Sequence, residues 1–218
     1  MRISIASGKG GTGKTTVAVN LALAGHYHVA GRVDLANPQA GNISAGNQVQ
    51  ILDCDVEEPN CHIFLKPKIE NKTEVTVPVP DVNESECTLC ATCGEVCAFH
   101  AIMPGKHRVL VFPELCHGCG ACALLCPSEA ITEIPRSVGI VETGFVDMSR
   151  SDHANSTKGD LPDVPNLARE AHSVKTLPFA QGILNPGEAL ATPVISEVKS
   201  AARNDCIVII DTPPEQQT

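Results

Sequence analysis

Short apolar runs and amphipathic stretches alternate along this chain. Residues 2–7, RISIAS, alternate polar and apolar side chains and end at a glycine-rich turn, which predicts a strand. Residues 49–55, VQILDCD, predict a second strand. Residues 206–211, CIVIID, predict a third, and their continuous apolar run is typical of a parallel strand that is buried on both faces.

Two longer stretches predict the helices that accompany these strands. Residues 14–24 follow the glycine turn, and their apolar positions include Val17, Leu21 and Ala24. Residues 187–204 predict a second helix, which Pro193 kinks or restarts. Strands that alternate with helices indicate an α/β layered domain.

Residues 74–135 differ in composition from both flanks. They begin with EVTVPVPDV, whose alternating valines and prolines suit an edge strand or a linker. Four cysteines in this region recur 29 residues later, together with the Ala-Ile pair that follows them. Two copies of a unit too poor in apolar residues to fold alone indicate a module held together by metal. We therefore predict an inserted α+β domain over residues 74–135, within a discontinuous domain of residues 1–73 and 136–218.

Two polar stretches interrupt the α/β pattern. Residues 25–47 and residues 144–176 are predicted to be long loops or disorder, which is unusual inside a compact domain. They are either real lobes or sequence that does not belong to the working protein.

Composition narrows the classes of function. A net charge of −9 and a pI near 5.3 argue against a general binder of nucleic-acid backbones, and the few aromatic residues argue against single-strand binding. The chain contains no apolar run of about 18 residues and no secretory signal, so we expect no transmembrane segment and a cytoplasmic location. Eight of the 11 cysteines lie in tight clusters, which favours metal binding over disulfides.

The clustered cysteines have the spacing C-x2-C-x2-C-x3-C, which bacterial-type ferredoxins use to hold [4Fe–4S] clusters. In two-cluster ferredoxins the fourth cysteine of each run binds the other cluster. The first predicted ligand set is therefore Cys87, Cys90, Cys93 and Cys126. The second is Cys116, Cys119, Cys122 and Cys97.

The alternative to iron–sulfur clusters is a pair of zinc sites, since C-x2-C also suits tetrahedral zinc. Pro127 after Cys126 favours the ferredoxin interpretation, whereas Ala98 after Cys97 departs from it. His117 is either a ligand or, as we prefer, a solvent-facing loop residue. Outside the repeat, Cys206 is expected to be a packed thiol, and Cys54 and Cys61 lack ligand spacing.

Residues 8–15, GKGGTGKT, fit the phosphate-loop pattern G-x-x-x-x-G-K-[ST] between a predicted strand and a predicted helix. Successive backbone N–H groups in such a loop form a nest for phosphate oxygens. The predicted nucleotide-binding residues are Gly8, Gly10, Gly11, Thr12, Gly13, Lys14, Thr15 and Thr16. Lys14 is expected to reach the terminal phosphates, and Thr15 to bind Mg²⁺ together with Asp211, which ends an apolar strand.

The string KGGTGKTT resembles the deviant Walker A motif of the MinD/ParA superfamily of P-loop ATPases, which includes the nitrogenase iron protein. The resemblance implies that Lys9 reaches across an ATP-dependent homodimer to the partner's ATP. It also implies that Asp55 orients the attacking water and that Asp53 supports Mg²⁺. With two ferredoxin motifs between DCDVEEPN and IIDTPP, the chain resembles the ferredoxin-containing branch of this superfamily.

The fold that this resemblance implies is a P-loop NTPase parallel sheet with helices on both faces. The family continues beyond IIDTPP, so we expect the nucleotide domain to lack its usual carboxy-terminal part. The expected function is ATP binding and ATPase activity, coupled to electron transfer or to iron–sulfur cluster delivery to a redox partner or apo iron–sulfur protein. The alternatives are a cluster scaffold or carrier, and a ferredoxin-type electron carrier on an inactive nucleotide fold.

Overall fold

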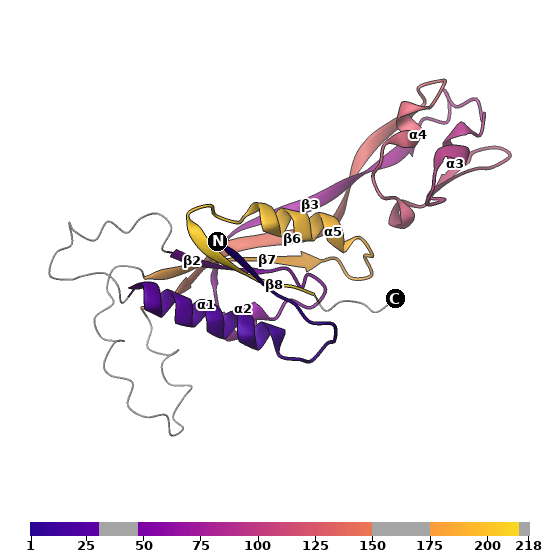
Figure 1. Ribbon diagram of the computed structural model, residues 1–218. Coiled ribbons are helices and arrows are strands. Elements are labelled where there is room, and N and C mark those ends of the chain that lie inside the picture. The colour runs from indigo at the N-terminus through magenta and orange to yellow at the C-terminus, as the bar shows by residue number, and fades with distance from the viewer. Residues whose placement is uncertain (31–47, 150–174, 214–218) are drawn as a thin grey trace. The chain divides into compact units, whose positions relative to one another are not determined.

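The computed structural model describes residues 1–30, 48–149 and 175–213 (Figure 1). The chain divides into two compact units. Unit 1 comprises residues 1–73, 141–183 and 195–218, and unit 2 comprises residues 74–140 and 184–194.

Most helices and strands belong to one of the two units. In unit 1 the elements are β1 (Arg2–Ile5), α1 (Lys14–Ala30), β2 (Gln48–Asp53), α2 (Cys61–Leu65), β7 (Thr176–Leu184, up to Ile183) and β8 (Cys206–Asp211). Unit 2 contains α3 (Thr92–Val96), β4 (Ile102–Pro104), β5 (Val109–Val111), the 3-10 helix η1 (Pro113–Leu115) and α4 (Ala121–Leu124). Strands β3 (Lys68–Val82) and β6 (Ile131–Asp147) and helix α5 (Ala191–Ser200) are divided between the two units, and Leu184 of β7 belongs to unit 2.

Six strands form one sheet in the order β1-β8-β2-β7-β6-β3. The pairs β1–β8, β8–β2 and β2–β7 are parallel. Strands β6 and β7 run in opposite directions, because Met148 N donates to Lys175 O at one end while Asn185 N donates to Val138 O at the other. The expectation of a parallel sheet is therefore corrected to a mixed, mostly parallel sheet in an α/β fold.

Alternation along β2 shows which helix covers which face. Val49 and Ile51 belong to the same buried cluster as Ala18 and Ala22 of α1. The side chain of Gln50 points to the other face, where its amide donates to Ala201 O, just after α5. Because strand side chains alternate between faces, Asp53 lies on the α1 side of the sheet.

The buried side of α1 differs from the apolar positions singled out in the sequence. Its core residues are Ala18, Val19 and Ala22, whereas Val17 is 53% exposed and Leu21 is 38% exposed. Ala24 is also exposed. Small residues let the helix approach the sheet closely, which apolar periodicity alone does not reveal.

Several predicted boundaries are corrected by the structure. Strand β2 ends at Asp53 and not at residue 55, because the Asp53 side chain accepts the backbone N–H of Asp55 and turns the chain. Pro193 lies in the first turn of α5, where a missing N–H costs no helical hydrogen bond, so it causes no kink. Strands β6 and β7 and the start of β3 have no counterpart among the predicted strands.

Both stretches predicted as loops contain ordered ends. Helix α1 continues to Ala30, and β6 continues to Asp147, while β7 begins at Thr176. The remainder of these two predictions, at residues 31–47 and 150–174, lies outside the described residues. No helix in the described ranges has the length and apolar character needed to cross a membrane.

Candidate iron–sulfur and phosphate-loop sites

The two cysteine runs of unit 2 share one backbone conformation. Three pairs of residues separated by 29 positions lie in the left-handed region, with nearly equal φ angles within each pair. The pairs are Leu89 and Gly118 (55° and 67°), Ala91 and Gly120 (69° and 72°), and His100 and Glu129 (53° and 52°). The internal repeat in the sequence is therefore also a repeat of structure.

Hydrogen bonds and strands follow the same repeat. Helices α3 and α4 each begin directly after a left-handed residue, Ala91 or Gly120. Phe112 N donates to Ala101 O at 2.7 Å, and at the equivalent position Asn83 N donates to Ala130 O at 2.8 Å. The strand pair β4–β5 is thus the counterpart of the paired ends of β3 and β6 within unit 2.

Four cysteines line each of two cavities in unit 2. The first cavity is lined by Cys87, Cys90, Cys93 and Cys126. The second is lined by Cys116, Cys119, Cys122 and Cys97. In each cavity three thiols come from one run and the fourth from the other copy, which are the groupings assigned from the sequence. Four converging thiols per cavity fit the ligand requirement of a [4Fe–4S] cluster.

The surroundings of the thiols differ between positions. A side-chain hydrogen bond with Thr92, at 3.4 Å, lowers the pKa of Cys90, and one with Ser128 lowers the pKa of Cys126. Burial opposes ionisation of Cys97, but backbone N–H groups, led by that of Ala101 at 3.3 Å, give a net lowering of its pKa. N–H groups directed at sulfur stabilise a thiolate, and in a cluster they also raise the reduction potential.

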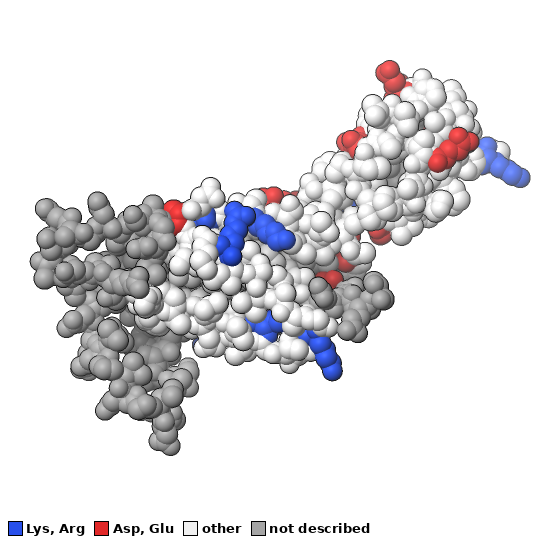
Figure 2. Space-filling model, in the orientation of Figure 1, with Lys and Arg blue, Asp and Glu red and all other residues white. Residues whose placement is uncertain are grey.

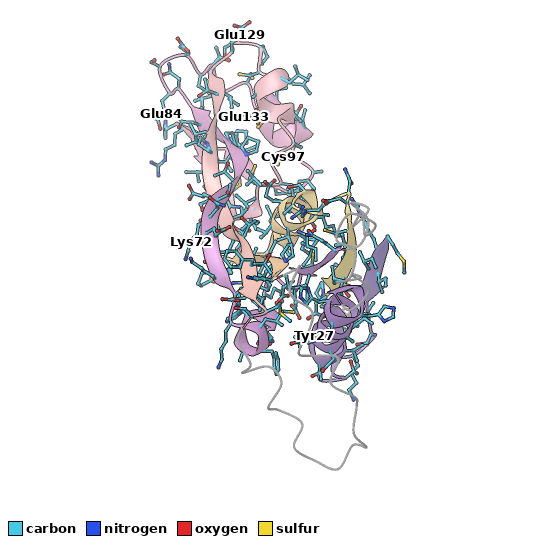
Figure 3. All side chains as sticks on the ribbon, turned by 90° about the vertical axis from the view of Figure 1, so that its left-hand side faces the viewer. Tyr27, Lys72, Glu84, Cys97, Glu129 and Glu133 are labelled. Carbon is cyan, nitrogen blue, oxygen red and sulfur yellow. The ribbon has the colours of Figure 1, made fainter. Side chains whose placement is uncertain are left out.

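The more enclosed thiols behave in the opposite way. Burial raises the pKa of Cys93 and of Cys122, the third cysteine of each run. A neutral thiol at these two positions must lose its proton when iron binds, so cluster assembly releases protons there. Cys97, labelled in Figure 3, follows α3.

His117 borders the second cavity without being enclosed by it. The imidazole is exposed and stacks on the Phe99 ring, with centroids 3.7 Å apart and planes at 10°. This placement suits the preferred prediction of a solvent-facing loop residue.

The predicted phosphate loop of unit 1 connects β1 to α1. Gly11 and Gly13 have φ angles of 73° and 84°, a conformation that L residues adopt only with strain. The hydroxyls of Ser7 and Thr12 lie 2.7 Å apart, and Ser7 Oγ donates to Lys9 O at 2.9 Å. Gly8, Lys9, Gly10 and Thr16 are exposed, whereas Lys14 and Thr15 are half-buried at the start of α1.

The three parallel strands β1, β8 and β2 end beside one another. The register pairs Ile5 with Asp211, and Asp211 with Asp53, so the loop that follows β1 leaves the same edge of the sheet as both carboxylates. Ligands of open α/β sheets bind at the carboxyl ends of the strands. The fold therefore brings the predicted loop and both predicted Mg²⁺ carboxylates to one edge.

Asp53 and Asp211 are both buried, at 0% and 1% exposure. Burial is the main cause that raises the pKa of Asp53 to about 6, and the nearby Asp211 adds to it. The Asp53 carboxylate accepts backbone N–H bonds from Asp55, Asn60 and Cys61 at 3.1, 3.0 and 2.9 Å. Asp211 Oδ1 is buried without a hydrogen-bond partner. An orphaned carboxylate oxygen at this edge fits a ligand for a divalent cation.

Asp55 is half-buried beyond the end of β2. Burial is the largest cause that raises its pKa, followed by repulsion from Asp211, while attraction to Lys14 opposes the rise. Asp55 and Lys14 thus interact electrostatically at the same edge as the two buried carboxylates.

Two polar residues at this edge, Cys61 and Gln181, have no role in a site among the sequence predictions. Cys61, which begins α2, is fully buried and its Sγ lies 3.6 Å from Asp211 Oδ2. Gln181 of β7 is paired in register with Asp53, and its amide donates to Glu142 Oε2 of β6 at 2.7 Å. A glutamine inside the apolar run LPFAQGIL was the available signal for Gln181, whereas no spacing rule points to Cys61.

Comparison with known proteins agrees with this picture of unit 2. Residues 109–132 match the family described as 4Fe-4S binding domain. The chain is 29% identical, over an alignment 229 positions long, to the uncharacterized protein MJ0578 of Methanocaldococcus jannaschii, covering 97% of this chain and 73% of that protein.

Two electron carriers match shorter parts of the chain. The electron transport protein HydN of Escherichia coli is 36% identical over 88 residues, which covers 38% of this chain and 50% of HydN. The 7Fe ferredoxin of Hydrogenibacillus schlegelii is 42% identical over 41 residues, which covers 19% of this chain and 53% of that ferredoxin.

Proposed function

Because the chain is homologous to MJ0578 and carries a 4Fe–4S ferredoxin-type domain, we propose that it is an iron–sulfur electron-transfer protein whose two clusters respond to ATP. The observation that carries the proposal is the lining of each of two cavities by four thiols. The ATP part rests on the loop of residues 8–15 and on the carboxylates at the same sheet edge.

The names of the relatives support an electron-transfer role. HydN is named an electron transport protein, and the other relative is named a ferredoxin. A [4Fe–4S] cluster exchanges one electron at a time, and its potential depends on solvent exposure and on hydrogen bonds to sulfur. In this chain the backbone N–H of Ala101 and the hydroxyls beside Cys90 and Cys126 would supply such bonds.

The nucleotide part of the proposal takes its support from loop geometry and from the resemblance to the MinD/ParA superfamily. The loop amides and Lys14 would hold the phosphates of ATP, with Lys9 reaching a second copy of the chain. Thr15, Asp53 and Asp211 would hold Mg²⁺, which neutralises phosphate charge when bound. The orphaned oxygen of Asp211 is the feature of this edge that suits the cation.

Hydrolysis of the bound ATP completes the proposed cycle. Lys14 is among the charges that act on Asp55, and we assign Asp55 the role that the resemblance implies, the orientation of a water molecule toward the terminal phosphate. By analogy with the nitrogenase iron protein, closure of an ATP-bound homodimer would change the surroundings of the clusters and hence their potential. Nucleic acid has no part in this proposal. On the face drawn in Figure 2, Lys and Arg side chains form one small group, and the others lie apart.

Cluster delivery to an apo iron–sulfur protein is the second candidate function. Cys90 and Cys119, one ligand in each cavity, are exposed. An exposed ligand gives an acceptor's thiol access to the cluster, as ligand exchange requires.

Iron and sulfide analysis of anaerobically reconstituted protein, combined with EPR with and without MgATP, tests the proposal. We expect about eight iron atoms per chain, as two cubane clusters require, and a reduced-state signal that changes with ATP. Zinc in place of iron would refute the cluster part. Intact clusters without ATP affinity would leave a ferredoxin-type carrier on an inactive nucleotide fold, and release of clusters to an apo-acceptor would favour delivery.

A further inference from the structure

A buried thiol and two buried carboxylates meet in unit 1. The ligand atoms of Asp53, Cys61 and Asp211 all lie within 4.8 Å of one another. None of the three residues is more than 1% exposed. They come from the ends of β2 and β8 and from the start of α2 (Figure 1).

The main chain holds these three side chains in place. Asp53 and Asp211 are register partners on adjacent parallel strands, so their side chains project from the same face. Asp53 Oδ2 accepts the N–H groups of Asn60 and Cys61, which fixes the first residue of α2 against the strand end. Cys61 Sγ then lies 3.6 Å from Asp211 Oδ2.

Within the described residues, no salt bridge offsets the negative charge of Asp53 and Asp211. Among the described residues, the ion pairs involve Lys72, Arg136 and Arg203, and none of them includes Asp53 or Asp211. Asp211 Oδ1 is buried and has no hydrogen-bond partner. Two adjacent buried carboxylates with an unused oxygen are costly unless a cation binds or a proton is retained.

The Cys61 thiol determines which cation suits the group formed by Asp53, Cys61 and Asp211. Mg²⁺ takes oxygen ligands in near-ideal octahedral geometry, whereas a thiolate together with carboxylates suits borderline divalent ions such as Zn²⁺ or Fe²⁺. With Zn–S near 2.3 Å and Zn–O near 2.1 Å, two ligand atoms on one ion lie at most about 4.4 Å apart. The 4.8 Å limit on the present separations is close to that span.

We propose that Asp53, Cys61 and Asp211 form a buried site for a borderline divalent metal ion, separate from the iron–sulfur clusters. On binding, the ion takes one oxygen from each carboxylate and the sulfur of Cys61, whose thiol proton leaves to solvent. The site shares two carboxylates with the proposed Mg²⁺ site, but it does not require ATP, and Cys61 is the residue that distinguishes the two ions.

Cadmium titration of the cluster-loaded, nucleotide-free protein tests this proposal. The eight cluster cysteines are then occupied, and constant visible absorbance during the titration shows that the clusters remain intact. We expect one Cd²⁺ per chain by calorimetry, a ¹¹³Cd NMR resonance at the downfield position typical of a thiolate ligand, and no displacement by excess Mg²⁺.

Two cysteine variants provide the matched comparison. Cys61→Ser should lower the Cd²⁺ affinity about tenfold or more while changing Mn²⁺ affinity less than about twofold. Cys206→Ser removes another buried thiol, at the opposite end of β8, and should change neither affinity. Equal Cd²⁺ affinity in the wild type and Cys61→Ser, or an equal loss in Cys206→Ser, would overturn the proposal.

The NMR measurement does not depend on whether Cys61→Ser folds. An all-oxygen ¹¹³Cd shift in the wild type, or no Cd²⁺ binding at all, would also overturn the proposal. Because no nucleotide is present, these results are separate from the failure of the proposed function, which would appear as absent ATP binding or absent clusters.

Discussion

The two units of this protein assemble their candidate sites in different ways. In unit 2 the eight thiols come from two copies of one short run, and the same left-handed residues recur in each copy. In unit 1 the loop, Asp53 and Asp211 are far apart in the sequence and meet only because β1, β8 and β2 are neighbours. Local spacing therefore specifies most of the first kind of site, whereas the second kind depends on strand order.

The exchange of the fourth cysteine between copies is the part of unit 2 that local spacing does not specify. The double variant Cys93→Ala/Cys126→Ala removes two thiols from one cavity and leaves the other complete, so about four iron atoms should remain. Cys93→Ala/Cys97→Ala removes one thiol from each cavity and should lose most of the iron from both.

Iron and acid-labile sulfide per chain measure this difference. If each run held its own cluster, the two results would be reversed, because Cys93 and Cys97 lie in the same run. This is the largest effect we expect, since a cubane that lacks one of its ligands loses its support.

A change in the phosphate loop should weaken ATP binding without removing the iron–sulfur clusters. Lys14→Ala removes a charge-assisted hydrogen bond to phosphate, worth about 1.5–3 kcal/mol, so ATP affinity should fall roughly 10- to 100-fold. Iron content should stay unchanged. Calorimetric titration with ATP measures the affinity, and Lys106→Ala in unit 2 is the control. Unaltered ATP affinity in Lys14→Ala would remove the loop from the proposed site.

An ion pair between β3 and β6 is expected to stabilise this side of the sheet. Lys72, labelled in Figure 3, lies 2.6 Å from Glu142, which is buried. Burial opposes ionisation of Glu142, but hydrogen bonds from Lys72 and Gln181 give a net lowering of its pKa. Lys72→Met should cost about 1 kcal/mol near pH 7, a modest figure because the lysine is 65% exposed.

The pH dependence of this loss has a defined sign. A carboxyl group with a lowered folded-state pKa contributes stability above its unfolded pKa, near 4.5, and loses it as the pH falls through the folded value. The difference between the wild type and Lys72→Met in urea unfolding, followed by circular dichroism, should therefore shrink below about pH 4.5. In a Glu142→Gln background the lysine substitution should have almost no effect, and a persistent cost there would assign it to lost packing.

The two copies in unit 2 offer a direct comparison in which the expected effects are also small. Ala91 and Gly120 occupy equivalent left-handed positions, and this conformation costs an L residue about 1–2 kcal/mol. Ala91→Gly should raise the melting temperature of the cluster-loaded protein, and Gly120→Ala should lower it, each by about 1 kcal/mol in free energy. A Cβ at Gly120 meets Glu133 only at 3.5 Å, so backbone strain and not a clash is the cause. Shifts of the same sign would show that the copies are not equivalent.

Local chemistry along the chain was enough to identify the α/β class, the strand 206–211 and the ferredoxin-type repeat. It also identified the first strand, which ends at Ile5 and not at residue 7. Each of these depends on residues close in sequence: an apolar run, a glycine turn, or cysteines at short spacing. The same reasoning missed strands β6 and β7 and their antiparallel pairing, because pairing depends on partners distant in the chain. It also singled out Val17, Leu21 and Ala24 of α1, whereas the alanines that are buried are Ala18 and Ala22.

Spacing and residue type were enough to identify the cysteine repeat, to predict the phosphate loop and to select the acidic residues as candidates. Folding added the position of Cys61 between Asp53 and Asp211, and of Gln181 beside Asp53. These residues are between 8 and 158 positions apart in the sequence, and no local rule connects them. They meet because parallel strands end at one edge of the sheet. Burial there removes water, so a polar side chain can be satisfied only by the groups that the topology places next to it.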